Sequence, residues 1–182
     1  MLQCAGPGID LPESVIECRY EVLRKPLGFS IDAARLSDDG DAIHAWVVLE
    51  GQVVSVGRAH LISGDGGSQD LPGSGPMLPP FPPLASDGAE RFHPAIQIRQ
   101  MGTRPVARRM GLGTLVLNAL LRASVRTWGA RTGFLQARTE ALRFYQANGW
   151  TLIGNPFDVP GVGPHRMMSK GLEGSAHDSS RS

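Results

Sequence analysis

A glycine-rich turn with two adjacent arginines is the part of the sequence best suited to binding an anion. Residues 108–113 read Arg-Arg-Met-Gly-Leu-Gly and open a segment of helical pattern. Glycines let the backbone turn tightly and approach a bulky ligand closely. The first turn of a helix offers N–H groups without intrahelical partners, and the helix dipole favours negative charge there. The segment predicts a phosphate cradle, although a turn that binds nothing fits the same six residues.

The cradle lies between a predicted strand and a predicted helix. Residues 95–103 begin with alternating apolar and polar side chains, which predicts a strand that Pro105 ends. From about Met110 to Trp128 a single row of polar residues at i+4 spacing interrupts an otherwise apolar pattern. This pattern predicts a helix that lies heavily buried against a sheet and stops at Gly129.

The other elements follow from periodicity and breaker residues. A helix is expected from Pro12 to before Pro26, and residues 43–49 and 52–62 read as a β-hairpin. Later segments predict a strand at 133–138, a short helix at 140–148, a strand start at 150–154, a turn-rich excursion at 155–163 and a last strand at 165–170.

Three segments lack such patterns. Residues 1–11 read as a loose N-terminal segment, and residues 172–182 read as a disordered polar tail. Residues 63–94 are rich in proline and glycine and poor in aliphatic side chains. Such a composition buries too little apolar surface to offset the entropy of ordering. We expect an extended or disordered surface loop there, more in keeping with a tolerated insertion than with a substrate lid.

Composition limits the class of protein. A chain of 182 residues suits one domain, and the alternation of strands and helices indicates an α/β or α+β fold on one sheet. A net charge of +1 indicates no nucleic-acid partner, and no segment is apolar enough for a membrane span. The two cysteines suggest no disulfide framework, and the five histidines show no metal-ligand spacing. We therefore expect a cytoplasmic protein without a metal.

Three motifs occur in an order that one enzyme family shares. Residues 108–113 match [QR]-x-x-G-x-[GA] at every defined position, directly after the predicted strand. A Phe-Tyr pair at 144–145 and a Gly-Trp step at 149–150 follow in the short helix and at its end. Residues 163–168, Gly-Pro-His-Arg-Met-Met, then lead into the last strand. Together these segments resemble the GNAT superfamily of acetyl-CoA-dependent N-acetyltransferases.

The resemblance covers about residues 12–171, which would form the N-acetyltransferase domain with 63–94 as a loop insertion. It implies a single domain with a mixed, twisted central β-sheet flanked by helices. It also implies an acyltransferase that moves an acetyl group from acetyl-CoA, its cosubstrate, to a primary amine in a ternary complex. The partner would be a small-molecule or peptide amine, and sheet edges leave a homodimer open.

The resemblance assigns the cofactor-binding residues. Backbone N–H groups of the cradle would hold the pyrophosphate, and the main chain at the end of the central strand would pair with the pantetheine amides. The residues so implied are Met101, Thr103, Arg108, Arg109, Met110, Gly111, Leu112, Gly113 and Thr114. The side chain of Arg104 would either add a contact to the ligand or be solvated.

The resemblance also assigns two catalytic residues. Tyr145 would protonate the leaving thiolate, although a tyrosine at helical spacing is commonly a core residue. His165 would orient the substrate or act as base, although a lone histidine at a strand start is commonly structural. His60 and His93 are weaker candidates for the base. Some relatives use a glutamate on the central strand, but residues 97–100 contain none.

Two other functions fit the sequence. A non-catalytic module that senses acetyl-CoA would keep the cradle and lack turnover. A nucleotide-binding protein of another fold would need a different motif, because residues 108–113 lack the Lys-Ser/Thr of a P-loop.

Overall fold

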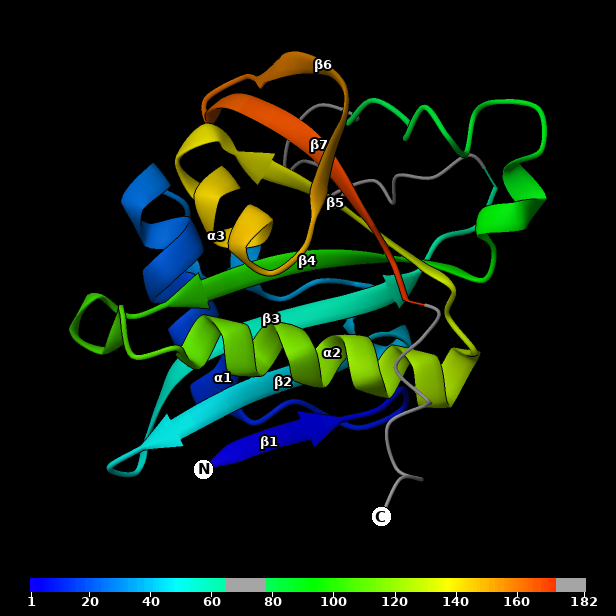
Figure 1. Ribbon diagram of the computed structural model, residues 1–182. Helices are drawn as coiled ribbons and strands as arrows, with labels where there is room; N and C mark the ends of the chain where they lie inside the picture. The colour runs from blue at the N-terminus through cyan, green and yellow to red at the C-terminus, as the bar shows by residue number, and fades with distance from the viewer. Residues whose placement is uncertain (65–77, 173–182) are drawn as a thin grey trace.

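The computed structural model describes residues 1–64 and 78–172 (Figure 1). It is a single domain built on one mixed seven-stranded sheet with the order β1-β2-β3-β4-β5-β7-β6. The strands are β1 (Leu2–Ala5), β2 (Ile43–Leu49), β3 (Gln52–Leu61), β4 (Ala95–Thr103), β5 (Thr132–Arg138), β6 (Thr151–Val159) and β7 (Gly163–Gly171). Neighbouring strands are antiparallel except β4 and β5, which are parallel.

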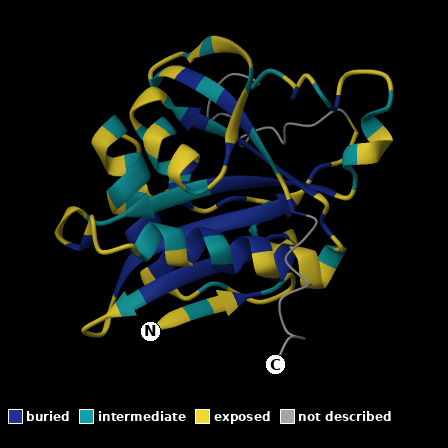
Figure 2. Ribbon diagram, viewed as in Figure 1, coloured by how far each residue is buried: buried dark blue, intermediate teal, exposed yellow. Residues whose placement is uncertain are grey.

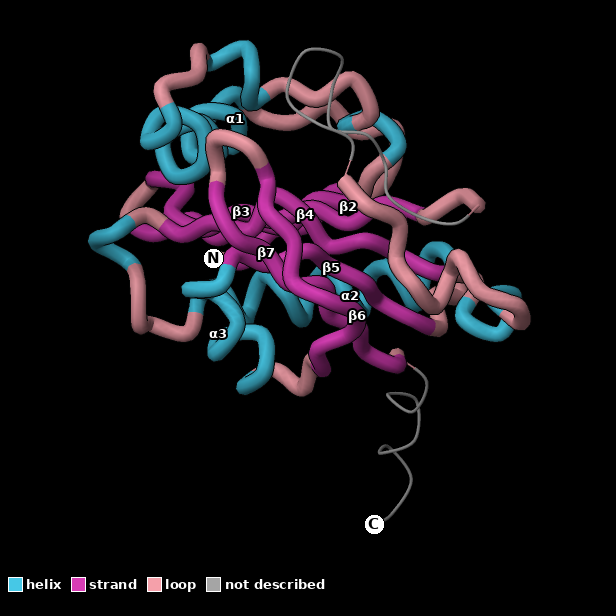
Figure 3. The backbone as a smooth tube through the Cα atoms, turned by 90° about the horizontal axis from the view of Figure 1, so that it is seen from above, coloured by secondary structure: helices cyan, strands magenta, loops and turns pink. Residues whose placement is uncertain are grey.

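Helices cover both faces of the sheet (Figure 3). On one face lies α1 (Glu13–Arg19), which continues as a π turn (Tyr20–Arg24) and a 3₁₀ turn (Lys25–Leu27). On the other face lie α2 (Leu112–Trp128) and the short α3 (Leu142–Ala147). The apolar side of α2 packs into the main core against β2, β3 and β4, as its sequence pattern predicts (Figure 2).

The central elements agree with the sequence expectations. The hairpin β2–β3 turns at Glu50 and Gly51, both with positive φ, which matches the twist of two paired strands. β4 has the predicted bounds, and α2 ends at Gly129 in the left-handed conformation. Among the described residues, no helix is long and apolar enough to cross a membrane.

Three sequence expectations are wrong. The first eleven residues are not uniformly loose, because residues 2–5 form β1, which pairs with β2. The loop expected at 63–94 is packed in part: Phe81 and Leu84 are buried against Phe134 of β5. Residues 65–77 of that loop and 173–182 of the tail lie outside the described residues. The turn-rich excursion is mostly strand, because β6 continues past an irregularity between Ile153 and Phe157.

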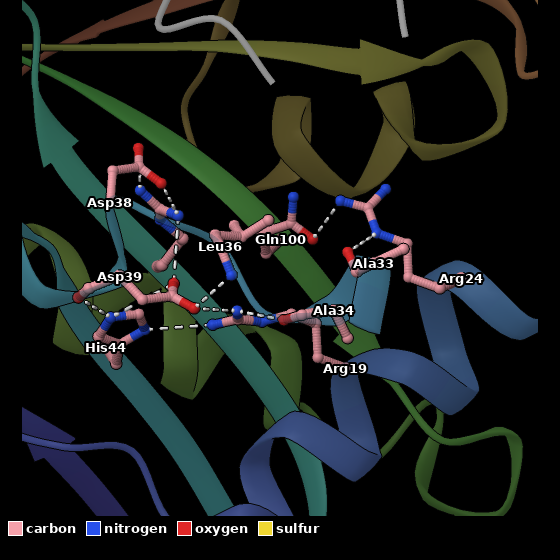
Figure 4. A network of polar contacts seen from close by, with 10 residues as sticks. Arg19, Arg24, Ala33, Ala34, Leu36, Asp38, Asp39, His44 and Gln100 are labelled. Carbon is pink, nitrogen blue, oxygen red and sulfur yellow. Dashed lines mark hydrogen bonds and ion pairs between the residues drawn. The ribbon is translucent and has the colours of Figure 1, made fainter. Parts of the chain in front are cut away.

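A network of two buried arginines and two partly exposed carboxylates fastens the region after α1 to the sheet (Figure 4). Asp39 accepts from Arg19 at 2.7 Å and from Arg58 of β3 at 3.2 Å. Asp38 binds the same Arg58 through both carboxylate oxygens, at 2.7 and 2.9 Å. His44 of β2 lies 2.9 Å from the backbone oxygen of Asp39. Because the two arginines are almost fully buried, the carboxylates are required partners.

Candidate functional site

The parallel strands β4 and β5 separate along their length and open the sheet. Among the described residues they pair only at their N-terminal ends, Ala95–Gln97 with Thr132–Phe134. A bulge in β4, where Gln100 and Met101 face the single residue 57 of β3, bends the strand beyond that pairing. Figure 1 shows the C-terminal ends of the two strands well apart. An extended ligand can lie between them.

The backbone of β4 beyond the bulge is directed into this opening. The N–H of Arg104 donates to the Val54 carbonyl on β3 at 2.8 Å. Because successive residues of a strand direct their backbone groups to opposite sides, those of Thr103 and Met101 point away from β3. The Thr103 carbonyl accepts from Arg108 Nε at 3.2 Å on that side.

The N-terminus of α2 faces a hollow of about 330 Å³. Gly111 precedes the helix with φ of 76°, a left-handed conformation that glycine adopts without steric cost. No side chain caps the first N–H groups of the helix. The hollow is lined by Thr103, Ala107, Arg108, Arg109, Gly111, Leu112, Gly113, Thr114 and Phe144. The predicted cradle residues are therefore together, except that Met110 is exposed and does not line the hollow.

A larger cavity of about 670 Å³ continues from this hollow. Both are lined by Thr103, Arg108, Gly113 and Phe144, so the two form one groove. The larger cavity is bounded by the turns after α1, by the separated parts of β4 and β5, by α3 and by the β6–β7 hairpin. Its volume lies in the range of small-molecule sites, about 300–1,000 Å³.

Tyr145 is both a core residue and a cavity residue. Its ring packs edge-on against Phe144 and Trp150, with centroids 5.0 and 6.1 Å away. The same side chain lines the cavity. Burial raises the pKa of Tyr145 above the ordinary value for a phenol, so the hydroxyl is protonated at neutral pH. It can therefore donate a proton.

His165 lines the same cavity from β7. Its Nδ1 lies 2.8 Å from the carbonyl oxygen of Gly163. A carbonyl can only accept, so Nδ1 carries the proton and a neutral ring has its lone pair on Nε2. Among the described residues, Nε2 has no hydrogen-bond partner. The imidazole can therefore accept a proton at Nε2.

Other candidates from the sequence lie outside the groove. His60 and His93 do not line either hollow, and burial beside Arg58 and Arg99 lowers the pKa of His60 to about 3. Arg104 is engaged by Glu21 at 2.6 Å and by the Val53 carbonyl. In the described part of the chain, no group of three or more His, Cys, Asp or Glu side chains could hold a metal ion.

The structure adds polar residues that sequence reasoning missed. Arg24 reaches the cavity from the π turn after α1, and Gln136 and Arg138 reach it from β5. The end of a parallel strand is a common place for ligand contacts, so Arg138 was accessible to prediction. Arg24 could not be predicted, because nothing in the local sequence indicates that the turn after α1 borders the cavity.

Comparisons with known proteins show the family and the fold of this chain. The model of the Acetyltransferase (GNAT) family matches residues 11–150. An uncharacterized N-acetyltransferase, YitI of Bacillus subtilis (strain 168), is 25% identical over 166 residues, which is 90% of this chain and 93% of that protein.

Solved structures share the fold. A putative N-acetyltransferase from Lactobacillus plantarum superposes with a TM-score of 0.64 at 18% identity, covering 94% of this chain and 98% of that one. An aminoglycoside 6'-N-acetyltransferase complexed with coenzyme A gives 0.61 at 13% identity, covering 93% and 97%. Since the family model spans most of the sequence and the fold agrees over nearly the whole chain, this protein belongs to the GNAT acetyltransferase family.

Proposed function

We propose that this protein transfers an acetyl group from acetyl-CoA to a primary amine by direct attack in a ternary complex. The observation that carries the proposal is the continuity of one groove from the uncapped N-terminus of α2 to the cavity with Tyr145 and His165. A groove of this shape can hold, one after the other, the pyrophosphate of acetyl-CoA, its thin pantetheine arm and the acceptor amine. Membership of the family supports acetyl-CoA as the donor.

The residues of the groove suit coenzyme A. The free N–H groups of Leu112, Gly113 and Thr114, with the dipole of α2, favour a pyrophosphate. Arg108 and Arg109 add positive charge there. The backbone groups of Met101 and Thr103 suit the amides of the pantetheine arm, which would extend the sheet as a short strand does.

Acetyl-CoA supplies a thioester whose carbonyl carbon accepts a nucleophile. An ammonium has no lone pair, so the acceptor must first lose a proton, and we assign this proton to Nε2 of His165. The amine nitrogen then forms the C–N bond as the C–S bond breaks, and the second proton that the nitrogen loses would restore the Tyr145 phenol after Tyr145 has protonated the leaving sulfur. The Met101 N–H would stabilise charge on the thioester oxygen, and Tyr145 would give its proton to the leaving sulfur.

The first test is calorimetric titration with acetyl-CoA, with ATP and NAD as controls, followed by thiol release with a panel of amines. We expect selective binding of acetyl-CoA and turnover with at least one amine. Binding without turnover on any amine would favour a non-catalytic sensor. Binding of ATP or NAD in preference to acetyl-CoA would refute the assignment of the groove.

The base is tested by His165→Asn. The asparagine amide can keep the hydrogen bond to the Gly163 carbonyl, but it lacks the lone pair of Nε2. We expect kcat to fall by about 10²-fold or more with acetyl-CoA affinity retained, in line with the usual contribution of a general base. An unchanged kcat would remove His165 from the mechanism.

A further inference from the structure

We propose that the acceptor is a primary amine that carries a carboxylate, of the α-amino acid class, and that Arg24 and Arg138 bind this carboxylate. The inference rests on the proposed acetyl transfer and deepens it by naming the acceptor. It depends on the charge of the cavity, on the hydrogen bonds that hold Arg24, on the guanidinium of Arg138, which makes none among the described residues, and on the position of Arg138 beside His165.

The cavity has an excess of positive charge. Among the described residues, the basic and acidic side chains that line it are Arg24, Arg99, Arg108, Arg138, His165 and Glu140. The carboxylate of Glu140 is the single acidic group, and its side chain is 72% exposed. An acceptor with several amines would meet repulsion from these guanidinium groups. An acceptor with an anionic group beside its amine would be attracted.

Arg24 is held in place by neutral groups. Its Nε donates to the Ala33 carbonyl at 3.0 Å, and its Nη2 donates to Gln100 Oε1 at 3.3 Å (Figure 4). In the described part of the chain it has no ion pair. Burial lowers the pKa of Arg24, and the nearby positive charges of Arg19 and Arg138 lower it further. A fixed guanidinium with uncompensated charge is suited to bind a carboxylate.

Arg138 brings a second guanidinium from the end of β5. Its Nη1 lies 3.9 Å from Glu140 Oε1, beyond hydrogen-bond distance. Among the described residues, its guanidinium donates no hydrogen bond. Arg99 also lines the cavity, but it makes an interaction of its own. We therefore expect it to add to the positive potential of the cavity, and we do not assign it to the carboxylate.

The sheet register places Arg138 next to the proposed base. Arg138 of β5 is directly opposite His165 of β7 in an antiparallel ladder. Directly opposite residues share one face of the sheet, with Cα atoms about 4.5–5.5 Å apart. In an α-amino acid one carbon separates the amine from the carboxyl group. An amine at His165 Nε2 therefore brings its carboxylate toward Arg138, whose charge is close enough to lower the pKa of Arg24 across the same cavity.

Part of the cavity wall is apolar, beside the polar side chains of Gln97, Gln100, Thr103 and Gln136. The apolar part of the turns after α1, the loop before β4 and the β6–β7 hairpin consists of Val22, Leu23, Leu27, Leu78, Val159 and Val162. These side chains provide little to hydrogen-bond a sugar or a second amine, but they can cover an aliphatic side chain. An α-amino acid with an aliphatic side chain, such as leucine, has the three features that this cavity recognises.

The experiment compares leucine with leucinamide, which has the same amine and side chain but no carboxylate, and with spermidine. Thiol release is measured at saturating acetyl-CoA. We expect kcat/KM for leucine to exceed that for leucinamide by about tenfold or more, the usual worth of a charge-assisted hydrogen bond. Spermidine should be the poorest of the three.

Arg138→Gln should lower kcat/KM for leucine by about 10- to 100-fold, mainly through KM, and should affect leucinamide far less. Arg138→Lys should restore part of the loss. Arg122→Gln is the matched control, because it removes the same charge from the exposed side of α2. In this control, kcat/KM for leucine and for leucinamide should equal the wild-type values.

Two results would overturn the inference: leucinamide or spermidine as the better acceptor, or equal losses for leucine and leucinamide in Arg138→Gln. Acetyl-CoA titration of the same samples separates this failure from failure of the proposed function. Tight binding of acetyl-CoA with turnover of other amines refutes only the acceptor class. If the wild-type protein does not bind acetyl-CoA, the acceptor class and the proposed acetyl transfer are both refuted.

Discussion

Tyr145 combines packing and chemistry in one side chain. Its ring is part of the core, while its hydroxyl has no hydrogen-bond partner among the described residues. Tyr145→Phe therefore removes the proton donor and little else. We expect kcat to fall by about 10²-fold, with acetyl-CoA affinity unchanged and stability within about 0.5 kcal/mol of the wild type. Steady-state kinetics, calorimetry and urea unfolding measure the three quantities. A wild-type kcat would mean that the thiolate leaves without help from this residue.

The sequence identifies some site residues better than others. The Arg-x-x-Gly-x-Gly pattern, residues 108–113, is local, because a strand, a turn and a helix start are consecutive in the chain. Arg24 and Arg138 meet only after the sheet has formed, since they belong to segments joined by neither periodicity nor motif. Such convergence is a property of the tertiary structure and leaves no trace in local spacing.

At the scale of one element, the first turn of α2 is shaped for a ligand at some cost in helix stability. A Cβ at Gly113 would lie 3.4 Å from the Phe144 ring and 3.7 Å from Thr103 Oγ1, inside the groove. Gly113→Ala should stabilise the protein by about 0.5–1 kcal/mol, because alanine favours helix more than glycine does. It should also weaken acetyl-CoA binding by about tenfold, because the methyl group occupies ligand space.

Thermal unfolding without ligand and calorimetric titration report these two effects separately. If Gly113 is glycine because the ligand needs the space, the variant should be more stable than the wild type and should bind acetyl-CoA more weakly. A variant that is more stable and binds acetyl-CoA as tightly as the wild type would show that the pyrophosphate does not use this turn.

The segment after α1 depends on the network of Arg19 and Arg58 with Asp38 and Asp39. Asp39→Asn leaves the Arg19 guanidinium, which is 1% exposed, without a carboxylate, whereas Arg58 keeps Asp38. Removing one partner of a buried ion pair typically costs about 3–5 kcal/mol, and we expect a loss at the lower end of that range. Urea unfolding at constant pH measures it.

The exposed pair of Glu13 and Arg35 provides the control, because both side chains are more than half exposed. Glu13→Gln should cost less than about 1 kcal/mol. Equal losses in Asp39→Asn and Glu13→Gln would contradict a structural role for the network. Because the network fastens the wall that includes Arg24, Asp39→Asn should also raise KM for the acceptor more than KM for acetyl-CoA.

For the whole molecule, sequence periodicity predicts the central helix and strands, but it misses segments whose order depends on contacts with distant parts of the chain. The buried stripe of α2 and the alternation in β4 are local patterns, and both elements formed as expected. β1 has four residues and is stabilised by pairing with β2, so its own sequence carries almost no signal. Phe81 and Leu84 are likewise ordered by a hydrophobic cluster with Phe134 rather than by their own proline-rich segment.

Stability of the whole fold should decrease in mild acid because of His60. Burial, reinforced by the positive charges of Arg58 and Arg99, lowers the pKa of His60 to about 3, against about 6.5 in an unfolded chain. The folded state thus binds a proton less readily than the unfolded state. The contribution of this histidine is complete above pH 6.5 and is lost progressively as the pH falls from about 6.5 to about 3. At pH 5 the loss is about 2 kcal/mol.

The measurement is urea unfolding of the wild type and of His60→Leu at pH 7.5 and pH 5.0. The wild type should lose about 2 kcal/mol more than the variant between the two pH values, because leucine does not titrate. His44, whose pKa burial also lowers, and the carboxylates other than Asp38 contribute equally to both proteins and cancel in the difference. If the two proteins lose the same free energy, His60 is solvated in solution, and the sheet is open where β3 meets β4.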